Sequence, residues 1–167
     1  MARGSRAHLR RGFGWIVHLT SKPMIAIDTN ILVYSHRREA PMHLVELRTM
    51  RELAGGAEQW AIPWPCVHEF YAVATHPKLW KGAQSTPNEA WTQIQAWKKS
   101  PNCRFLNENE DYESVFGTLV ESVKFRGPVV HDARVAALCI VHGVKELWTA
   151  DRDFSLFPRL RCRNPLV

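Results

Sequence analysis

Short apolar runs alternate with longer amphipathic stretches along this chain. A run of about four apolar residues that is rich in β-branched or aromatic side chains is typical of a buried strand and is too short for a helix. The runs predict strands at residues 24–27, 60–62, 103–106 and 146–149, with a last edge strand at 161–163. Because helical stretches separate these strands, the pattern predicts an α/β fold with a parallel sheet.

Apolar residues three and four positions apart mark the stretches between the strands as helices. Thr86 offers a side-chain oxygen that can cap the helix after it, and Gly55 and Gly127 lie where helices are expected to end. The predicted helices are 29–35, 41–54, the segment after Pro65, the segment after Thr86, 111–126 and 131–142. Four tryptophans fall in apolar patterns and are predicted to lie in the core: Trp64, Trp91, Trp97 and Trp148.

The net charge of the chain is +6, but most of this charge comes from one end. Residues 1–23 contain five basic side chains and no acidic one, so the rest of the chain is close to neutral. A charge placed in this way is weak support for nucleic-acid binding by the folded part. Glycine and histidine interrupt the apolar part of this segment, which argues against a signal peptide. We expect residues 1–23 to be a basic leader, disordered or due to a mis-assigned start, and residues 24–167 to form the one domain.

Four cysteines are scattered along the chain without a Cys-x-x-Cys pair: Cys66, Cys103, Cys139 and Cys162. In a chain of this length such spacing is typical of buried free thiols in a reducing compartment, so a cytoplasmic protein is predicted. No apolar run approaches the roughly 18 residues that a membrane-spanning helix needs, and no contact with a membrane is expected.

Four acidic residues stand at predicted junctions between strands, loops and helices: Asp28, Glu69, Asp132 and Asp151. In a parallel sheet such junctions can meet beyond the carboxyl ends of the strands. Each acid also has a purely structural interpretation, because an aspartate can cap a helix and a glutamate can interact with the helix dipole. Taken together, however, clustered carboxylates repel one another, and a hard divalent cation such as Mg²⁺ would offset that repulsion. Such a site can orient a phosphodiester and activate a water to attack it.

Other kinds of site find less support in the sequence. Cys66 with His68, and Cys139 with His142, are spaced like halves of a zinc site, but no second pair follows at the spacing of a zinc finger. The sequence contains no glycine-rich phosphate loop, dinucleotide-binding fingerprint or nucleophile elbow, so nucleotide-cradling and serine-hydrolase functions are not supported.

Three stretches that carry the four acids resemble the VapC toxin family of PIN-domain ribonucleases. They are residues 25–30 (IAIDTN), residues 63–70 (PWPCVHEF) and, most specific, the tail that begins with HDARVAA at 131 and contains TADRDF at 149–154. The resemblance covers residues 24 to about 165. It implies a PIN-like fold, in which helices wrap a central parallel sheet of about four to five short strands. It also implies a Mg²⁺-dependent endoribonuclease, in which Mn²⁺ can take the place of Mg²⁺.

Carried over position by position, the resemblance implies roles for individual residues. Asp28 and Asp132 would be the principal metal ligands, and Glu69 and Asp151 would complete the catalytic pocket. The secondary members of the site would be polar residues next to these acids: Asn30, Thr149 and Asp153. The expected partners are an RNA substrate, a small cognate antitoxin of the VapB type and a second copy of the chain in a homodimer.

Two other functions stay open. The chain can be a PIN-like RNA-binding module that keeps the acidic pocket without cleaving, although the presence of all four acids argues against this. It can also be a phosphotransfer or phosphatase domain that uses Asp28 as an acceptor, but Asn30 then stands where a second acid is wanted.

The sequence also offers expectations about contacts and variants. The nearest candidates for contact with RNA are basic and aromatic residues: Arg37, Arg38, Lys78, Trp80, Lys81 and Arg152. An antitoxin is expected to place an Arg in the acidic pocket, with Leu32, Tyr34 and Phe70 supplying an apolar groove. Replacing Asp28 or Asp132 with Asn is expected to abolish cleavage with the fold intact, and Asp28→Asn to raise the melting temperature of the metal-free protein.

Overall fold

A five-stranded parallel sheet forms the centre of the computed structural model, which describes residues 23–122 and 127–167. Its strands are β1 (Met24–Ile27), β2 (Gln59–Pro63), β3 (Cys103–Leu106), β4 (Glu146–Trp148) and β5 (Cys162–Arg163). The strand order is β3-β2-β1-β4-β5, and each neighbouring pair is parallel. β1 is the central strand, and all four of its residues are buried. The predicted parallel α/β sheet is therefore confirmed.

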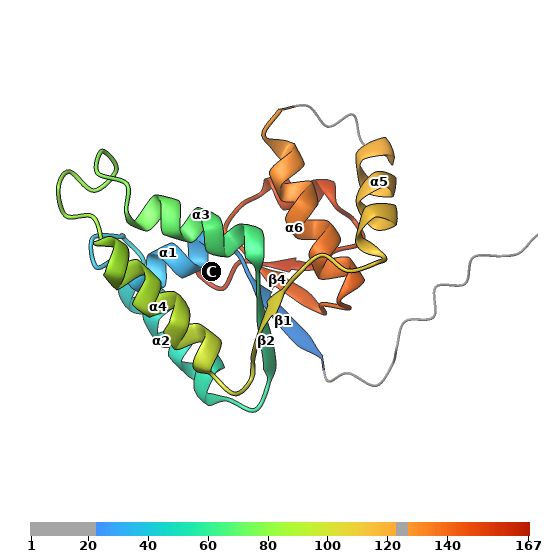
Figure 1. Cartoon of the computed structure of the whole chain (residues 1–167). Helices are drawn as coiled ribbons and strands as arrows, with labels where there is room; N and C mark the ends of the chain where they lie inside the picture. The colour runs from blue at the N-terminus through green and yellow to red at the C-terminus, as the bar shows by residue number, and fades with distance from the viewer. Residues whose placement is uncertain (1–22, 123–126) are drawn as a thin grey trace, which may run out of the picture.

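Within the described residues, six α-helices and one short 3₁₀ helix connect the strands. They are α1 (Thr29–His36), α2 (His43–Gly55), α3 (Trp64–Ala74), α4 (Pro87–Lys99), α5 (Tyr112–Ser122), α6 (Val129–Val141) and the 3₁₀ helix η1 (Asp153–Leu156). The paired helices α5 and α6 stand on one side of the strands, and α1 to α4 stand on the other (Figure 1). Large side chains from both the sheet and the helices are fully buried between these layers: Ile27, Trp60, Ile62, Phe70 and Leu147.

Most predicted elements lie within two residues of the observed ones, and the differences have local causes. Helix α6 begins at Val129 instead of His131, because Pro128 stands at its N-cap and the helix follows directly. The predicted cap of α4 is confirmed, since Thr86 accepts a hydrogen bond from Glu89 and Glu89 reaches back to Thr86. The leader, residues 1–22, and the end of the fifth predicted helix, including Val123, lie outside the described residues.

The prediction that four tryptophans lie in the core is right for two of them. Trp97 and Trp148 are buried, whereas Trp64 is partly buried and Trp91 keeps 49% of its surface exposed. Helical spacing places Trp91 on the same side of α4 as Ile94, but its larger ring extends past the covered part of that side. Leu44 in α2, which also fits the helical spacing, is exposed as well.

One carboxylate is buried in the core away from the predicted site. Glu46 in α2 is fully buried, and neither of its carboxylate oxygens has a hydrogen-bond partner within the described residues. Burial raises the pKa of Glu46 from the usual 4.5 to about 7, because the charged form loses its hydration. The folded protein therefore holds this proton more tightly than the unfolded chain does.

Replacing Glu46 with Met should stabilise the protein at neutral and alkaline pH. Since the folded pKa lies above the unfolded value, the neutral carboxyl's contribution to stability is complete below pH 4.5 and is lost as the pH rises to about 7. We expect Glu46→Met to raise the unfolding free energy by about 1–3 kcal/mol at pH 8, the usual cost of an unsatisfied buried polar group. Thermal denaturation of both proteins at pH 5 and pH 8 measures this. An equal difference between them at both pH values would contradict the assignment.

Candidate active site

The central strand β1 delivers Asp28 to the carboxyl end of the sheet, where its side chain is only 6% exposed. Its Oδ1 accepts hydrogen bonds from the backbone N–H of Thr29 at 2.7 Å and from the Cys66 thiol at 3.6 Å. Its Oδ2 accepts from Nδ2 of Asn30 at 2.7 Å and from the Thr149 hydroxyl at 2.6 Å. Four donors thus fix both oxygens of this carboxylate.

Hydrogen bonds join the start of α1 to the loop after β4. Asn30 accepts from the backbone N–H of Ala150 at 3.0 Å, and its Nδ2 also lies 3.1 Å from the Thr149 hydroxyl oxygen. Thr149 in turn accepts from the N–H of Asp151 at 2.9 Å, and Asp151 accepts from the N–H of Asp153 at the same distance. The predicted secondary residues Asn30 and Thr149 therefore connect Asp28 to the segment that carries Asp151 and Asp153.

Helix α3 brings Glu69 to the same place. β2 leads directly into α3, whose first turn contains Pro65, a residue that suits this position because its fixed φ matches the helix. The Thr29 hydroxyl donates a hydrogen bond of 2.7 Å to Oε2 of Glu69, while the Thr29 N–H bonds Asp28. Thr29 therefore bridges two of the predicted acids.

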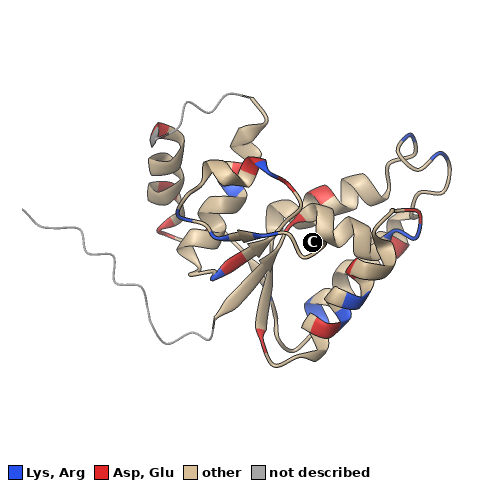
Figure 2. Cartoon of the chain, turned by 180° about the vertical axis from the view of Figure 1, so that it is seen from behind, with Lys and Arg blue, Asp and Glu red and all other residues tan. Residues whose placement is uncertain are grey.

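Asp132 joins the cluster from the first turn of α6. Burial is the main cause that raises the pKa of its carboxyl to about 6, and the carboxylates of Asp151, Asp28, Asp153 and Glu69 follow in that order. The same kind of effect acts on Asp28, where burial raises the pKa, hydrogen bonds from Thr149 and Thr29 oppose it, and the charge of Glu69 adds to it. The structure thus brings the other three predicted acids and Asp153 within electrostatic reach of Asp132. Seen from behind, acidic segments gather where the central strands meet the helices (Figure 2).

The capping interpretations apply to only part of this cluster. Asp28 is indeed the N-cap of α1. Asp132 does not cap α6, whose N-cap is Pro128, and the N-cap of η1 is Arg152 instead of Asp151. Capping explains Asp28, and Asp151 makes a cap-like bond to the N–H of Asp153 at the start of η1, but neither explains why Glu69 and Asp132 lie beside them.

The negative charge of the cluster has no cationic partner within the described residues. The ion pairs among the described residues include none of the predicted acids. They join Arg37 to Glu39, Arg134 to Glu108 and Arg161 to Glu146. A set of carboxylates and hydroxyl oxygens without a counter-charge fits a hard cation such as Mg²⁺. No three His, Cys, Asp or Glu side chains in residues 23–122 and 127–167 are already arranged to hold a metal ion.

The thiols next to the site are buried and free. Cys66 in α3 and Cys139 in α6 are fully buried, Cys103 is partly buried and Cys162 is exposed, so the expectation of buried free thiols holds for two of the four. Burial is the main cause that raises the pKa of the Cys66 and Cys139 thiols, and the charge of Asp28 adds to it. A sequence pattern gives no signal for the contact between Cys66 and Asp28.

One residue predicted to contact RNA is committed elsewhere. Arg37 is 6% exposed, pairs with Glu39 at 2.9 Å and donates to the Ser85 hydroxyl at 2.8 Å and to the carbonyl of Ala83. Its guanidinium also lies 4.6 Å from the centre of the Trp80 ring. The prediction that Arg37 is free to bind RNA is therefore wrong, because this side chain fastens the loop between α3 and α4 to α1.

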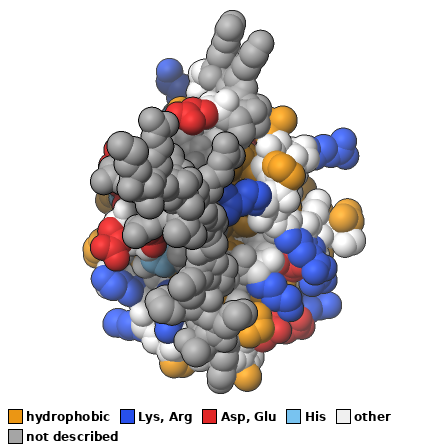
Figure 3. Space-filling view, turned by 90° about the vertical axis from the view of Figure 1, so that its right-hand side faces the viewer, with side chains coloured by type: hydrophobic (Ala, Val, Ile, Leu, Met, Phe, Trp, Pro, Cys, Tyr) orange, Lys and Arg blue, Asp and Glu red, His pale blue; other side chains and the backbone are white. Residues whose placement is uncertain are grey.

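Four other candidates remain exposed: Arg38, Lys78, Lys81 and Arg152. On the face seen in Figure 3, basic and acidic side chains are interspersed over the part that grey atoms leave visible. The charge on this visible surface does not gather into one basic patch.

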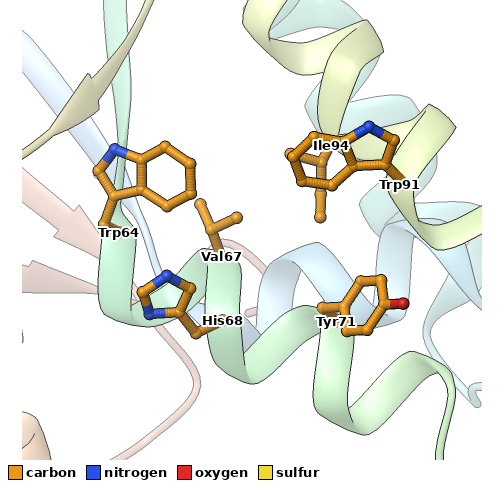
Figure 4. A pocket seen from close by; sticks show the side chains of 6 residues that line it. All are labelled: Trp64, Val67, His68, Tyr71, Trp91 and Ile94. Carbon is orange, nitrogen blue, oxygen red and sulfur yellow. The ribbon is translucent and has the colours of Figure 1, made fainter. Parts of the chain in front are cut away.

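The predicted apolar groove for an antitoxin is wrong in its residues, because Leu32 and Phe70 are fully buried in the core and only Tyr34 is partly accessible. A different apolar groove of about 380 Å³ lies between α3 and α4. Its lining residues are Trp64, Val67, His68, Tyr71, Trp91 and Ile94. Trp64 and Trp91 stand at opposite sides of it, with Val67 between them (Figure 4).

None of the helices in the described residues has the length and apolar character needed to cross a bilayer.

Comparison with known proteins identifies the family of this chain. The sequence matches the PIN domain family over residues 25–160. It is 31% identical over 138 residues to ribonuclease VapC48 of Mycobacterium tuberculosis, covering 83% of this chain and 94% of that protein. It is also 31% identical over 143 residues to ribonuclease VapC43 of the same species, covering 86% of this chain and 96% of that protein.

Solved structures show the same fold at lower sequence identity. One is VapBC2 from Rickettsia felis bound to a DNA fragment from its promoter, with a TM-score of 0.62 at 16% identity, covering 84% of this chain and 98% of that one. Another is M. tuberculosis VapC20, a sarcin-ricin loop cleaving toxin, with a TM-score of 0.56 at 17% identity, covering 78% and 92%. With the family match over most of the chain and two VapC relatives above 30% identity, the chain belongs to the VapC family of PIN-domain proteins.

Proposed function

We propose that this protein is a Mg²⁺-dependent endoribonuclease that acts as the toxin of a toxin–antitoxin pair. The observation that carries the proposal is that four acids converge at the carboxyl end of a parallel sheet. Thr29 and Thr149 link Asp28 to Glu69 and to the backbone of Asp151, and the charges of these acids help to raise the pKa of Asp132 to about 6. Ligands of open α/β sheets bind at this end. The ribonuclease names of the two VapC relatives support RNA as the substrate.

In this proposal Asp28 and Asp132 are the principal ligands of Mg²⁺ or Mn²⁺. When bound, the cation would supply Lewis-acid stabilisation of the phosphodiester and favour the attacking water. Asp28 enters such a site already oriented by its four hydrogen-bond donors. Glu69 and Asp151 extend the acidic wall and can accept hydrogen bonds from a water that attacks phosphorus. The hydrogen bonds of Asn30 and Thr149 hold the start of α1 against the loop after β4, and the carboxylate of Asp153 adds to the negative charge of the cluster.

Incubation of the purified full chain with RNA tests the proposal directly. Cleavage that requires Mg²⁺ or Mn²⁺ and stops when EDTA is added is the expected result. Binding of RNA without cleavage under every metal condition would favour the RNA-binding module instead. Transfer of phosphate to Asp28 from a phosphate donor would favour a phosphotransfer domain.

We further propose that a small VapB-type antitoxin blocks this site. Structures of toxin–antitoxin complexes share the fold, including VapBC2 of Rickettsia felis and FitAcB of Neisseria gonorrhoeae. A cluster of carboxylates without a counter-charge suits an Arg side chain, which stays protonated and forms paired hydrogen bonds with carboxylates. The toxin is proposed to act in the cytoplasm, where its free thiols stay reduced, and to form a homodimer, which light scattering of the purified chain tests.

Induction of this chain alone should arrest growth, and co-expression of the small neighbouring open reading frame should restore it. The two products should also purify together, because an inhibitor that occupies the acidic site must bind tightly to protect its own cell. Growth arrest, rescue and co-purification are measured in the same strain. A chain that is harmless when induced, with a neighbour that neither binds it nor changes its nuclease activity, would refute the toxin assignment and leave the fold untouched.

A further inference from the structure

Cys66 contacts the predicted site without belonging to the acidic cluster. Its Sγ lies 3.6 Å from Oδ1 of Asp28, and its side chain is fully buried. The only other donor to Oδ1 among the hydrogen bonds of the described residues is the backbone N–H of Thr29. The thiol therefore contacts this oxygen from the buried side of the site, where α3 packs against α1.

We propose that Cys66 is a positioning residue, whose thiol holds Oδ1 of Asp28 and so fixes the orientation of this carboxylate. This inference rests on the proposed function, since it concerns the orientation of a proposed metal ligand. Partners that hydrogen-bond a metal ligand orient it, and their loss commonly costs 10–100-fold in metal affinity. Because an S–H group is a weak donor, we place Cys66 at the lower end of that range, at about tenfold.

The competing explanation is that Cys66 only fills space, as buried free cysteines often do. Cys139 in α6 provides the matched comparison. It is equally buried and equally free, and Asp28 adds to the rise of its thiol pKa, but no hydrogen bond joins it to Asp28 in the described structure. Loss of the Cys139 thiol removes packing alone, whereas loss of the Cys66 thiol removes packing and a donor.

Calorimetric titration of the full chain with Mn²⁺ separates the two explanations. Cys66→Val, which keeps an apolar group of similar size, should raise the Kd for Mn²⁺ about tenfold. Cys66→Ser, which restores a donor, should stay within about twofold of the wild type, and so should Cys139→Val. A Cys66→Val protein that binds Mn²⁺ as tightly as the wild type would overturn the proposal, as would equal weakening in Cys139→Val. If Cys66→Val does not fold, Cys66→Ala takes its place under the same criteria.

A crystal structure of metal-free Cys66→Val provides a readout that does not depend on the cation. The Asp28 carboxylate should turn away from its present orientation and lose at least one of its bonds to Thr29, Asn30 and Thr149. An unchanged carboxylate would overturn the positioning role, even if the wild type binds no Mn²⁺. Conversely, a turned carboxylate in a protein whose wild type binds no Mn²⁺ would support the positioning role and count against the metal site of the proposed function.

Discussion

Replacing Asp132 with Asn should reduce the rate of Mg²⁺-dependent RNA cleavage by roughly 10²–10³-fold, the size of effect seen when one electrostatic group is removed at a reacting centre. Asp132 is the sharpest site for this test because no hydrogen bond or ion pair of the described residues includes its side chain. An amide of the same shape therefore removes charge without breaking a contact. Rates measured on a defined RNA at saturating Mg²⁺ give the answer.

Glu113→Gln serves as the control for this variant, since Glu113 is an exposed acid in α5 without a hydrogen bond or ion pair in the described structure. It loses the same charge without belonging to the acids that act on Asp132, and it should cleave at the wild-type rate. Asp132→Asn with undiminished cleavage would remove this residue from the mechanism and, with it, the main argument for a metal held between α6 and β1.

Asp28→Asn and Asp132→Asn should change the stability of the metal-free protein in opposite directions. Asp28→Asn should lower the unfolding free energy by about 1–3 kcal/mol, because one amide oxygen cannot accept from all the donors that the carboxylate serves. Its NH₂ group must face either the N–H of Thr29 or the amide of Asn30. The helix cap of α1 weakens at the same time. This prediction differs from the expectation, based on sequence, that Asp28→Asn leaves the fold intact and raises the melting temperature of the metal-free protein. The difference comes from the hydrogen bonds that the Asp28 carboxylate accepts in the structure.

Asp132→Asn should instead raise the melting temperature in EDTA, because it relieves repulsion from the neighbouring carboxylates. Differential scanning calorimetry of the wild type and both variants, in EDTA and in Mg²⁺, measures the effect. The wild type should gain stability with Mg²⁺ as RT ln(1 + [L]/Kd), and both variants should lose most of that gain. A lower melting temperature for Asp132→Asn in EDTA, or equal Mg²⁺ shifts in all three proteins, would contradict the electrostatic account.

The sequence predicts those parts of this molecule that depend on local pattern. Apolar runs identify β1 to β4, the edge strand expected at 161–163 appears as β5, and Thr86 with Glu89 forms the expected cap of α4. The four acids could be selected because each lies near the carboxyl end of a strand or in the first two turns of a helix, and the carboxyl ends of parallel strands share one edge. Whether these acids act in catalysis stays a prediction.

The remaining features depend on contacts between distant segments, which a periodic pattern does not encode. The sequence gives Arg37 the appearance of a surface cation, but in the structure it contacts Ser85 and Trp80 of the loop after α3. Leu32 and Phe70 fit an amphipathic helix, but the pattern does not tell which apolar residues stay accessible. A glutamate in an amphipathic helix is expected on its exposed side, but Glu46 is buried without a hydrogen-bond partner in the described structure. Nothing in the neighbouring sequence indicates this burial.

The position of β4 in the sheet has a consequence for the order in which the acidic cluster is assembled during synthesis of the chain. β1 pairs with β2 near the beginning of the chain, but it waits for β4, more than a hundred residues later, before Thr149 can bond Asp28. A ribosome that has reached the end of α6 has made Asp28, Glu69 and Asp132 but not Asp151. The unfinished chain thus lacks part of the acidic cluster, which is complete only after β4 and the loop that follows it have been made.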